Sequence, residues 1–218
     1  MTPNDVLNAR LEKFRNIDIY PVISSEFTNG RDVLDVLKMI ADGGAGIVQL
    51  REKNCSARER FKLAGRYREI TDQYGMLLIV DDDAACAAAV DADGVHLGQD
   101  DLPPEAARKL FPSLIVGVST HDIAEATAAQ AAGCGYLNIG PVFATATKSL
   151  PMAPVGLAMI DAVRPLLKVP FTVMGGIKLG NLAELREHGV TRAAMVTEIT
   201  RAADITRTVR ELIAELAK

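Results

Sequence analysis

Short apolar runs alternate along the chain with longer stretches in which apolar residues recur at helical spacing. Runs of this length are typical of buried strands, whereas the longer stretches predict helices and often end in glycine, the usual helix C-cap. The apolar runs begin at Ile19, Gly46, Leu77, Gly94, Leu114, Tyr136, Phe171 and Ala193. The pattern therefore predicts eight strands with helices between them.

The alternation of strand and helix implies parallel strands joined by right-handed crossovers. An open doubly wound sheet and a closed barrel both satisfy this order, but eight units of roughly equal length favour closure. A chain of 218 residues with no obvious linker also suits one such domain. We therefore predict an α/β fold, a single (β/α)8 TIM barrel over residues 1–218, with residues 1–16 as a short N-terminal helix that precedes the barrel.

Composition narrows the class of protein further. The formal net charge of -4 gives no general attraction to nucleic acid or to an anionic membrane surface. The apolar residues form no run of membrane length, and the N-terminal segment has no secretory pattern, so we expect a cytoplasmic protein. The three cysteines are far apart and form no CxxC pair, which argues against disulfides or a zinc site.

Catalytic groups of such a barrel belong where the strands end. After the second apolar run, Gln49, Arg51 and Lys53 are alternate residues, so their side chains point the same way if the strand extends that far. Two cations on one face can bind a phosphate. Alternatively, they form ion pairs with Glu52 or another neighbour at a solvated strand end.

Acidic residues follow the next two runs, at positions 81–83 and, after Gln99, at positions 100 and 101. Carboxylates grouped at one rim repel each other unless a cation joins them, and magnesium suits oxygen ligands from protein, water and diphosphate. Asp83 and Asp101 each precede a predicted helix, so helix capping is the alternative. Capping needs only one aspartate of each group, and we therefore predict a magnesium site.

Later strand ends carry further polar residues. Ser119 and Thr120 end the fifth run and precede His121, which is either a general base or a structural residue at a loop–helix junction. The long segment after the sixth run holds hydroxyls and a cation spaced to clasp an anion, and Lys148 is the strongest candidate there. Gly175 and Gly176 follow the seventh run, where backbone N–H groups often bind phosphate.

Six segments, taken in this order and at this spacing, resemble the thiamine phosphate synthase family. They are QLREK from Gln49, VDDD from Val80, DGVHLGQDDL from Asp93, GVSTH from Gly117, GPVFATATK from Gly140 and VMGGI from Val173. The resemblance spans most of the predicted barrel, from Gln49 to Thr197. It implies a transferase that joins hydroxymethylpyrimidine diphosphate to a thiazole phosphate, with Mg²⁺ as cofactor and diphosphate as leaving group.

The resemblance also implies a role for each matching residue. Asp82 and Asp101 match the magnesium ligands, and Lys148, Ser119 and Arg51 are the candidate catalytic residues. The implied ligands of the pyrimidine diphosphate are Gln49, Arg51, Lys53, Asp81, Ser119, Thr120 and Lys148. The implied ligands of the thiazole phosphate are Thr145, Thr147, Gly176, Val196 and Thr197.

One position departs from the family pattern. Asp81 stands where the family usually has asparagine, and a carboxylate cannot donate a hydrogen bond to a diphosphate as an amide can. Two other functions therefore stay open: a thiazole tautomerase that uses a histidine such as His121, and a noncatalytic barrel that binds thiamine precursors. The sequence also leaves open whether the chain forms a homo-oligomer, because barrel helices that face solvent or a partner show similar patterns.

Overall fold

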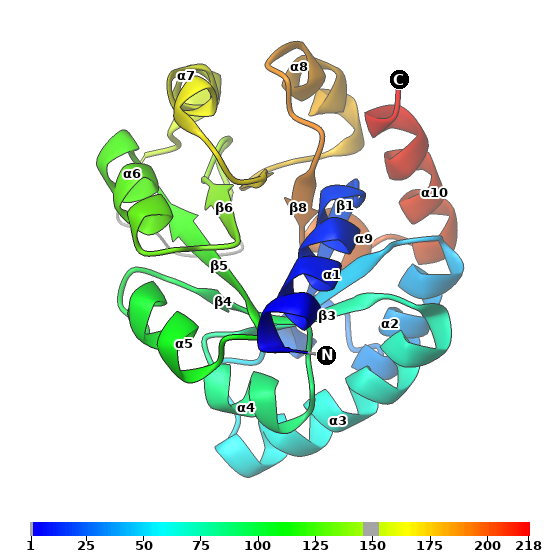
Figure 1. Ribbon diagram of the computed structural model, residues 1–218. Helices are drawn as coiled ribbons and strands as arrows, with labels where there is room; N and C mark the ends of the chain where they lie inside the picture. The colour runs from blue at the N-terminus through cyan, green and yellow to red at the C-terminus, as the bar shows by residue number, and fades with distance from the viewer. Residues whose placement is uncertain (1, 146–152) are drawn as a thin grey trace.

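The computed structural model describes residues 2–145 and 153–218, and within these residues eight parallel strands form a closed barrel in the order β1 to β8 (Figure 1). The strands are β1 (Ile19–Ile23), β2 (Ile47–Leu50), β3 (Leu77–Asp81), β4 (Gly94–Leu97), β5 (Ile115–Thr120), β6 (Tyr136–Ile139), β7 (Phe171–Met174) and β8 (Ala193–Met195). Each predicted apolar run contains one strand, and β8 pairs with β1, so the predicted TIM barrel is confirmed.

Helices surround the barrel and cover its outer face (Figure 1). The α-helices are α1 (Pro3–Arg15), α2 (Val33–Asp42), α3 (Ala57–Tyr74), α4 (Ala84–Ala89), α5 (Pro104–Leu110), α6 (Ile123–Ala131), α7 (Gly156–Val163), α8 (Leu182–Glu187), α9 (Thr197–Thr200) and α10 (Ile205–Leu216). Short 3-10 turns are η1 (Ser25–Phe27), η2 (Arg164–Leu166) and η3 (Leu179–Asn181).

Local capping explains where several of these helices begin and end. Ser56 and Glu59 form a reciprocal capping box at the start of α3, and Gly75 ends that helix in the left-handed conformation, with φ of 66°. Asp32 caps α2 through the backbone N–H groups of its first turn. The glycine that marked a predicted helix end is therefore used as a C-cap, and polar residues cap the helix starts.

The apolar residues divide into an outer and an inner core. The outer core lies between the barrel and the helices. The inner core lies inside the barrel and includes the first residues of four strands, namely Ile47, Leu77, Ile115 and Tyr136. Because the side chains at these strand starts face inward, the amino-terminal end of the barrel is filled with apolar groups.

Helix α1 closes that end of the barrel, and Figure 1 shows it lying across the barrel opening. Phe14 is fully buried, and its ring stacks on that of Tyr136 with 4.3 Å between centroids. Arg10 anchors the helix through ion pairs to Asp91 at 2.9 Å and to Asp93 at 3.2 Å. With the amino-terminal end closed, the carboxyl ends of the strands are left to build the site.

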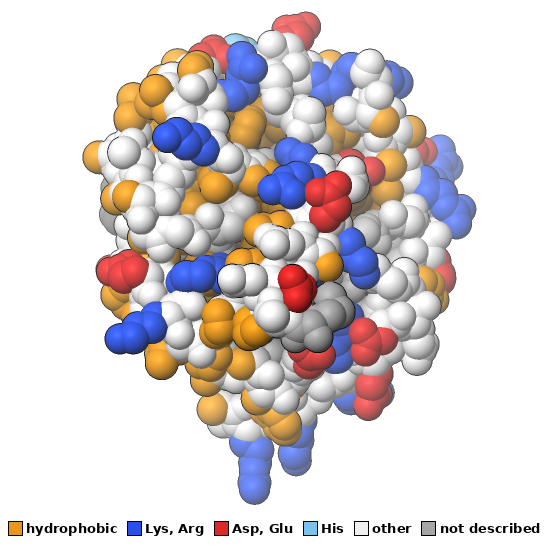
Figure 2. Space-filling view, in the orientation of Figure 1, with side chains coloured by type: hydrophobic (Ala, Val, Ile, Leu, Met, Phe, Trp, Pro, Cys, Tyr) orange, Lys and Arg blue, Asp and Glu red, His pale blue; other side chains and the backbone are white. Residues whose placement is uncertain are grey.

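The surface gives no sign of a single-charge patch on the face that carries α1. Figure 2 shows Lys and Arg side chains interspersed there with Asp and Glu side chains and scattered hydrophobic groups. Within residues 2–145 and 153–218, no helix combines the length and the apolar character that crossing a membrane requires.

Candidate functional site

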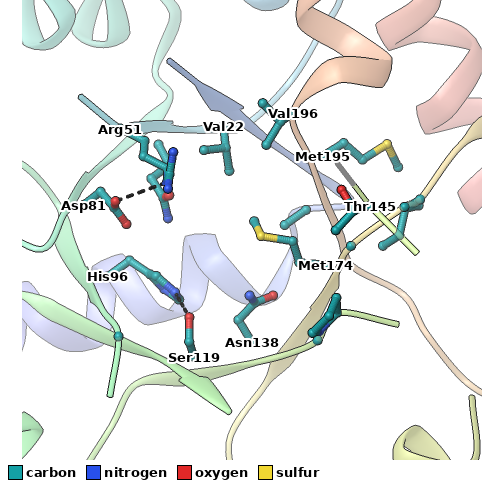
Figure 3. A pocket seen from close by; sticks show the side chains of 18 of the residues that line it. Val22, Arg51, Asp81, His96, Ser119, Asn138, Thr145, Met174, Met195 and Val196 are labelled. Atoms are coloured by element: carbon teal, nitrogen blue, oxygen red, sulfur yellow. Dashed lines mark hydrogen bonds and ion pairs between the residues drawn. The ribbon is translucent and has the colours of Figure 1, made fainter. Parts of the chain in front are cut away.

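A cavity of about 550 Å³ opens at the carboxyl ends of the strands. This volume is suited to a small-molecule site. Figure 3 shows side chains from opposite sides of the barrel pointing into it. The predicted site residues that line the cavity are Gln49, Arg51, Lys53, Asp81, Asp82, Asp101, Ser119, Thr145, Gly176, Val196 and Thr197.

Three predicted ligands are not among these lining residues. Thr120 faces away from the cavity: its side chain is fully buried, and its hydroxyl donates to the backbone oxygen of Asn138 at 3.3 Å. Along a strand successive side chains point to opposite faces, so only Ser119 of this pair faces inward. The assignment of the Thr120 side chain to the substrate therefore has to be corrected. Thr147 and Lys148 lie outside the described residues.

The two predicted cations reach the same part of the cavity. Strand β2 ends at Leu50, so Arg51 and Lys53 belong to the following loop rather than to an extended strand. Both side chains nevertheless line the cavity. Glu52 is turned away from them, because its carboxylate accepts hydrogen bonds from the backbone N–H and the hydroxyl of Ser25, each at 2.8 Å. Of the alternative ion pairs expected from the sequence, the one with Glu52 is therefore not formed, whereas pairs with other neighbours, Asp81 and Asp82, are formed.

Asp81 and Asp82 bind these cations. Oδ2 of Asp81 lies 2.9 Å from Nζ of Lys53 and 3.5 Å from Nε of Arg51. Lys53 also forms a close ion pair and hydrogen bond with Asp82. The backbone of Asp82 is in the left-handed region, with φ of 62°, which aspartate and asparagine adopt more readily than most residues. With this backbone conformation Asp82 does not continue β3, and its side chain lies at the cavity rim.

Of the three aspartates at positions 81–83, Asp81 and Asp82 form ion pairs at the cavity rim, and Asp83 caps a helix. Asp83 caps α4 by accepting from the backbone N–H of Cys86 at 2.8 Å, and it forms an ion pair with Arg60 at 3.0 Å. Capping thus accounts for Asp83 alone. In the second acidic group Asp101 does not cap α5. Its carboxylate instead accepts from the backbone N–H of Gly98 at 2.6 Å and contacts the carboxylate of Asp82.

The electrostatics of these acids follow from burial and mutual repulsion. Burial, together with the charge of Asp82, raises the pKa of Asp81 to about 6 against the opposing effect of Lys53. Burial also raises the pKa of Asp101, and the adjacent Asp82 carboxylate adds to this. Burial alone would raise the pKa of Asp82, but the hydrogen bond and the charge of Lys53, together with Asp101 and the charge of Arg51, outweigh burial and lower the pKa. At the rim, the carboxylates of Asp82 and Asp101 therefore lie against each other, and Lys53 lies beside Asp82.

A chain of buried hydrogen bonds forms the floor of the cavity. Nε2 of Gln49 donates to the hydroxyl of Tyr20 at 3.1 Å, and this hydroxyl lies 2.9 Å from that of Tyr136. The Tyr136 hydroxyl lies 2.9 Å from Nδ1 of His96, whose Nε2 lies 2.8 Å from Oγ of Ser119. The chain crosses the barrel from β2 to β5, and Figure 3 shows its His96 and Ser119 end.

The direction of this chain follows from the first donor. Because Tyr20 accepts from Gln49, its own buried proton needs another acceptor, and Tyr136 is the neighbour that can accept it. Tyr136 then donates to Nδ1 of His96, which leaves the imidazole proton on Nε2. His96 donates in turn to Ser119, so the Ser119 hydroxyl proton is left to point into the cavity. Burial raises the pKa of both tyrosines, which keeps them protonated.

Sequence reasoning missed most of this floor. His96 is buried within β4, and it lines the cavity together with Asn138. The available signal was a polar residue in the middle of an otherwise apolar strand, as in GVHLG and YLNIG. The two cations Lys178 and Arg201 at the rim were missed as well.

The opposite side of the cavity is built from tight backbone turns. Gly175 and Gly176 have φ of 102° and 62°, and a Cβ on Gly176 would lie 2.5 Å from the backbone oxygen of Ala144. Glycine is therefore required for the loop after β7 to pack against the loop after β6. Val196 and Thr197 follow β8 and line the same side. Backbone N–H groups at such turns can bind a phosphate.

His121 also lines the cavity, and its side chain is engaged. Its Nδ1 lies 2.8 Å from Oε2 of Glu125, which also accepts from the His121 backbone N–H at 2.7 Å. The predicted structural role at the loop–helix junction therefore has a physical basis, since this contact ties the loop to the first turn of α6.

Comparison with known proteins is consistent with this geometry. The family model for thiamine monophosphate synthase matches residues 19–199, from the first residue of β1 into α9. The thiamine-phosphate synthase of Pelotomaculum thermopropionicum is 41% identical, over 92% of this chain and 93% of that protein. The thiamine-phosphate synthase of Chloroflexus aurantiacus is 40% identical, over 89% of this chain and 90% of that protein. Among solved structures, thiamine phosphate pyrophosphorylase from Pyrococcus furiosus has a TM-score of 0.86 at 31% identity and covers 94% of this chain and 98% of that one.

Proposed function

The chain belongs to the thiamine monophosphate synthase family, and we propose that it joins hydroxymethylpyrimidine diphosphate to a hydroxyethylthiazole phosphate, releasing diphosphate. One observation carries this proposal: a single cavity has a cationic and acidic rim on one side and glycine-rich phosphate-binding turns on the other. Two phosphorylated substrates can therefore bind with their rings close together. The product is thiamine phosphate.

The cationic rim suits the diphosphate. Arg51 and Lys53 line the cavity on this side, and arginine and lysine are the side chains that neutralise phosphate charge. Lys148, which lies outside the described residues, is proposed as a third cation on the basis of the family motif that contains it. These groups would stabilise the negative charge that develops on diphosphate as its bond to the pyrimidine methylene breaks.

Asp82 and Asp101 fit a magnesium ion. Their carboxylates are in contact although like charges repel, which is the arrangement that a bound cation stabilises. Among the described residues no three His, Cys, Asp or Glu side chains gather as a metal site. Two carboxylates would leave the remaining positions to water and diphosphate oxygens, as Mg²⁺ prefers. When bound, Mg²⁺ would supply further neutralisation of the leaving diphosphate.

The reaction needs little acid–base chemistry. The electron-rich aminopyrimidine can support positive charge on its methylene group after diphosphate leaves, and the thiazole nitrogen then attacks that carbon. Ser119 would hold the pyrimidine through its inward-pointing hydroxyl, as the direction of the floor hydrogen bonds suggests. The main catalytic contributions of the chain are then electrostatic stabilisation and the orientation of two rings.

The glycine-rich side suits the thiazole phosphate. We assign the backbone of Gly176, Val196 and Thr197 to this phosphate, with Thr145 beside it at the cavity wall. Thr147 is proposed as a further ligand from the family motif and lies outside the described residues. A phosphate held on this side directs the thiazole nitrogen toward the centre of the cavity, where the methylene group would be exposed.

The direct test mixes both substrates with MgCl₂ and purified protein and measures thiamine phosphate and diphosphate. Both products should form in equal amounts, and omission of either substrate or chelation of the metal should stop the reaction. No product from well-folded protein would overturn the proposal. Isomerisation of a thiazole carboxylate alone would identify a tautomerase, and tight binding without turnover would identify a binding protein.

A further inference from the structure

Asn138 is a polar residue of the cavity floor to which the family motifs assign no role. It lies on β6, between Ser119 of β5 and Thr172 of β7, and Figure 3 shows its amide directed into the cavity. The side chain is 5% exposed, so its polar atoms must find partners within the barrel or on a ligand. An asparagine in this position is costly unless its amide is used.

The orientation of this amide is set by a neighbouring strand. The hydroxyl of Thr172 on β7 is fully buried and donates to Oδ1 of Asn138 at 2.8 Å. Since Oδ1 accepts this bond, Nδ2 is turned away from Thr172. No group within residues 2–145 and 153–218 is paired with Nδ2, which leaves it as a hydrogen-bond donor to the cavity.

Gln49, another residue of the cavity floor, presents a hydrogen-bond acceptor to the cavity instead of a donor. Its Nε2 is committed to Tyr20, so its Oε1 remains as an acceptor. The floor therefore offers an acceptor on β2 and an amide donor on β6, on different sides of the barrel. A ring that carries an amino group and ring nitrogens presents a matching donor and acceptors.

Only one of the two proposed substrates suits such a floor. The thiazole nitrogen is the nucleophile, and a hydrogen bond donated to it would occupy the lone pair that has to attack. The aminopyrimidine has two ring nitrogens whose lone pairs take no part in the bond that forms. A donor on the floor is therefore compatible with the pyrimidine ring and not with the thiazole ring.

We propose that Asn138 is a specificity residue that donates a hydrogen bond from Nδ2 to a ring nitrogen of the aminopyrimidine, and that Thr172 is a positioning residue that holds the amide in this orientation. This inference rests on the proposed function, since it assumes that the pyrimidine diphosphate is a substrate. It adds two residues to those that the family resemblance implies.

Binding measurements test the proposal separately from turnover. Calorimetric titration of the pyrimidine diphosphate into the protein with MgCl₂ should show affinity reduced by roughly 3- to 13-fold in Asn138→Ala, the upper part of the loss expected for one neutral hydrogen bond. Affinity for the thiazole phosphate should change less than about twofold, because this ligand loses no contact in the variant and distant sites are usually independent to within that factor. A parallel loss for both ligands, or no loss for either, would overturn the assignment.

The positioning role of Thr172 has its own variants. Thr172→Val removes the hydroxyl with little change in shape and should weaken pyrimidine diphosphate binding in the same direction as Asn138→Ala, whereas Thr172→Ser should restore it. Thr71→Val is the matched control, because Thr71 is also fully buried but donates to Tyr67 within α3, outside the cavity lining. If the Val variants at both positions weaken binding equally, the effect is structural and the positioning role is wrong.

Substrate analogues identify the bond itself. Two pyridine analogues of the diphosphate, each with one ring nitrogen replaced by C–H, should be compared in the native protein and in Asn138→Ala. One of them should bind the native protein about 3- to 13-fold more weakly than the pyrimidine and should lose this difference in the variant. Equal discrimination by both proteins would overturn the proposal. If the native protein binds the pyrimidine diphosphate but forms no product, the proposed synthase function is wrong. The binding measurements still show whether Asn138 recognises the pyrimidine ring.

Discussion

The hydroxyl of Tyr136 lies 2.9 Å from Nδ1 of His96, although 40 residues separate the two along the chain. Both side chains point into the barrel, from β6 and β4. Because Tyr136 in turn accepts from Tyr20, it donates to His96 and places the imidazole proton on the side of Ser119. One tyrosine at the closed end of the barrel thus sets the polarity of the cavity floor.

Replacement of Tyr136 tests this relationship. Tyr136→Phe leaves Nδ1 of His96 and the proton of Tyr20 without their partner, and unsatisfied buried groups of this kind cost about 1–3 kcal/mol each. We expect a lower free energy of unfolding in urea. Nitrogen NMR of His96 should show protonation of Nε2 in the native protein and a mixture of tautomers in the variant.

Tyr74→Phe is the matched control for that change. Tyr74 also loses a hydrogen bond, to Asp42 at 2.8 Å, but the residue is 45% exposed, so water replaces the lost partner. Equal destabilisation by both replacements would contradict the role of Tyr136 as the link in the buried chain.

A second prediction concerns the close contact between Gly117 and the Tyr136 ring. A Cβ on Gly117 would lie 2.1 Å from the ring, so Gly117→Ala should displace the ring and cost about 1–3 kcal/mol of stability. Gly65→Ala in the interior of α3 meets no atom within 4 Å and should instead stabilise the protein by about 0.5–1 kcal/mol. Urea denaturation of the two variants checks the difference, and a stable Gly117→Ala protein would show that the barrel interior can repack.

A third prediction separates the metal site from the thiazole phosphate site. Asp82→Asn removes one carboxylate charge while asparagine tolerates the left-handed backbone at this position. We expect kcat to fall on the order of 10²-fold, because the leaving diphosphate loses electrostatic stabilisation. The affinity for thiazole phosphate, measured by calorimetry, should be unchanged.

Asp83→Asn provides the control for the third prediction. It removes the same charge one residue away, and asparagine still caps α4, so only the ion pair with Arg60 is lost. Its kcat should stay near that of the native protein. Equal loss of turnover in both variants would mean that kcat falls because one negative charge is removed, and not because Asp82 binds the metal.

The departure from the family at Asp81 gives a fourth prediction. Its carboxylate lies 2.9 Å from Lys53 and competes with the diphosphate for that cation. Asp81→Asn should lower KM for the pyrimidine diphosphate by roughly fivefold, equivalent to about 1 kcal/mol of released ion pairing. Steady-state kinetics with each substrate varied in turn measures this change. A rise in KM would mean that the carboxylate takes part in binding, for example through the metal.

Much of the fold followed from local patterns in the sequence. The eight strands, the helices between them and the caps at Asp32, Ser56 and Gly75 depend on periodicity and on nearest neighbours, which the order of residues specifies directly. The rim residues that follow β2, β3 and β4 were also accessible from sequence, because the carboxyl ends of barrel strands meet at one face whatever the detailed packing.

The orientation of individual side chains depended on contacts across the barrel. Tyr20 and Tyr136 are 116 residues apart, and Asn138 and Thr172 are 34 apart, so no local pattern could reveal that their polar atoms pair. Sequence alone therefore predicted the rim residues that follow strand ends, such as Arg51 and Asp82, but not the rim cations Lys178 and Arg201. Only the tertiary structure decided which polar atoms of the site are already hydrogen-bonded and which remain for a ligand, because those partners come from strands that closure of the barrel brings together.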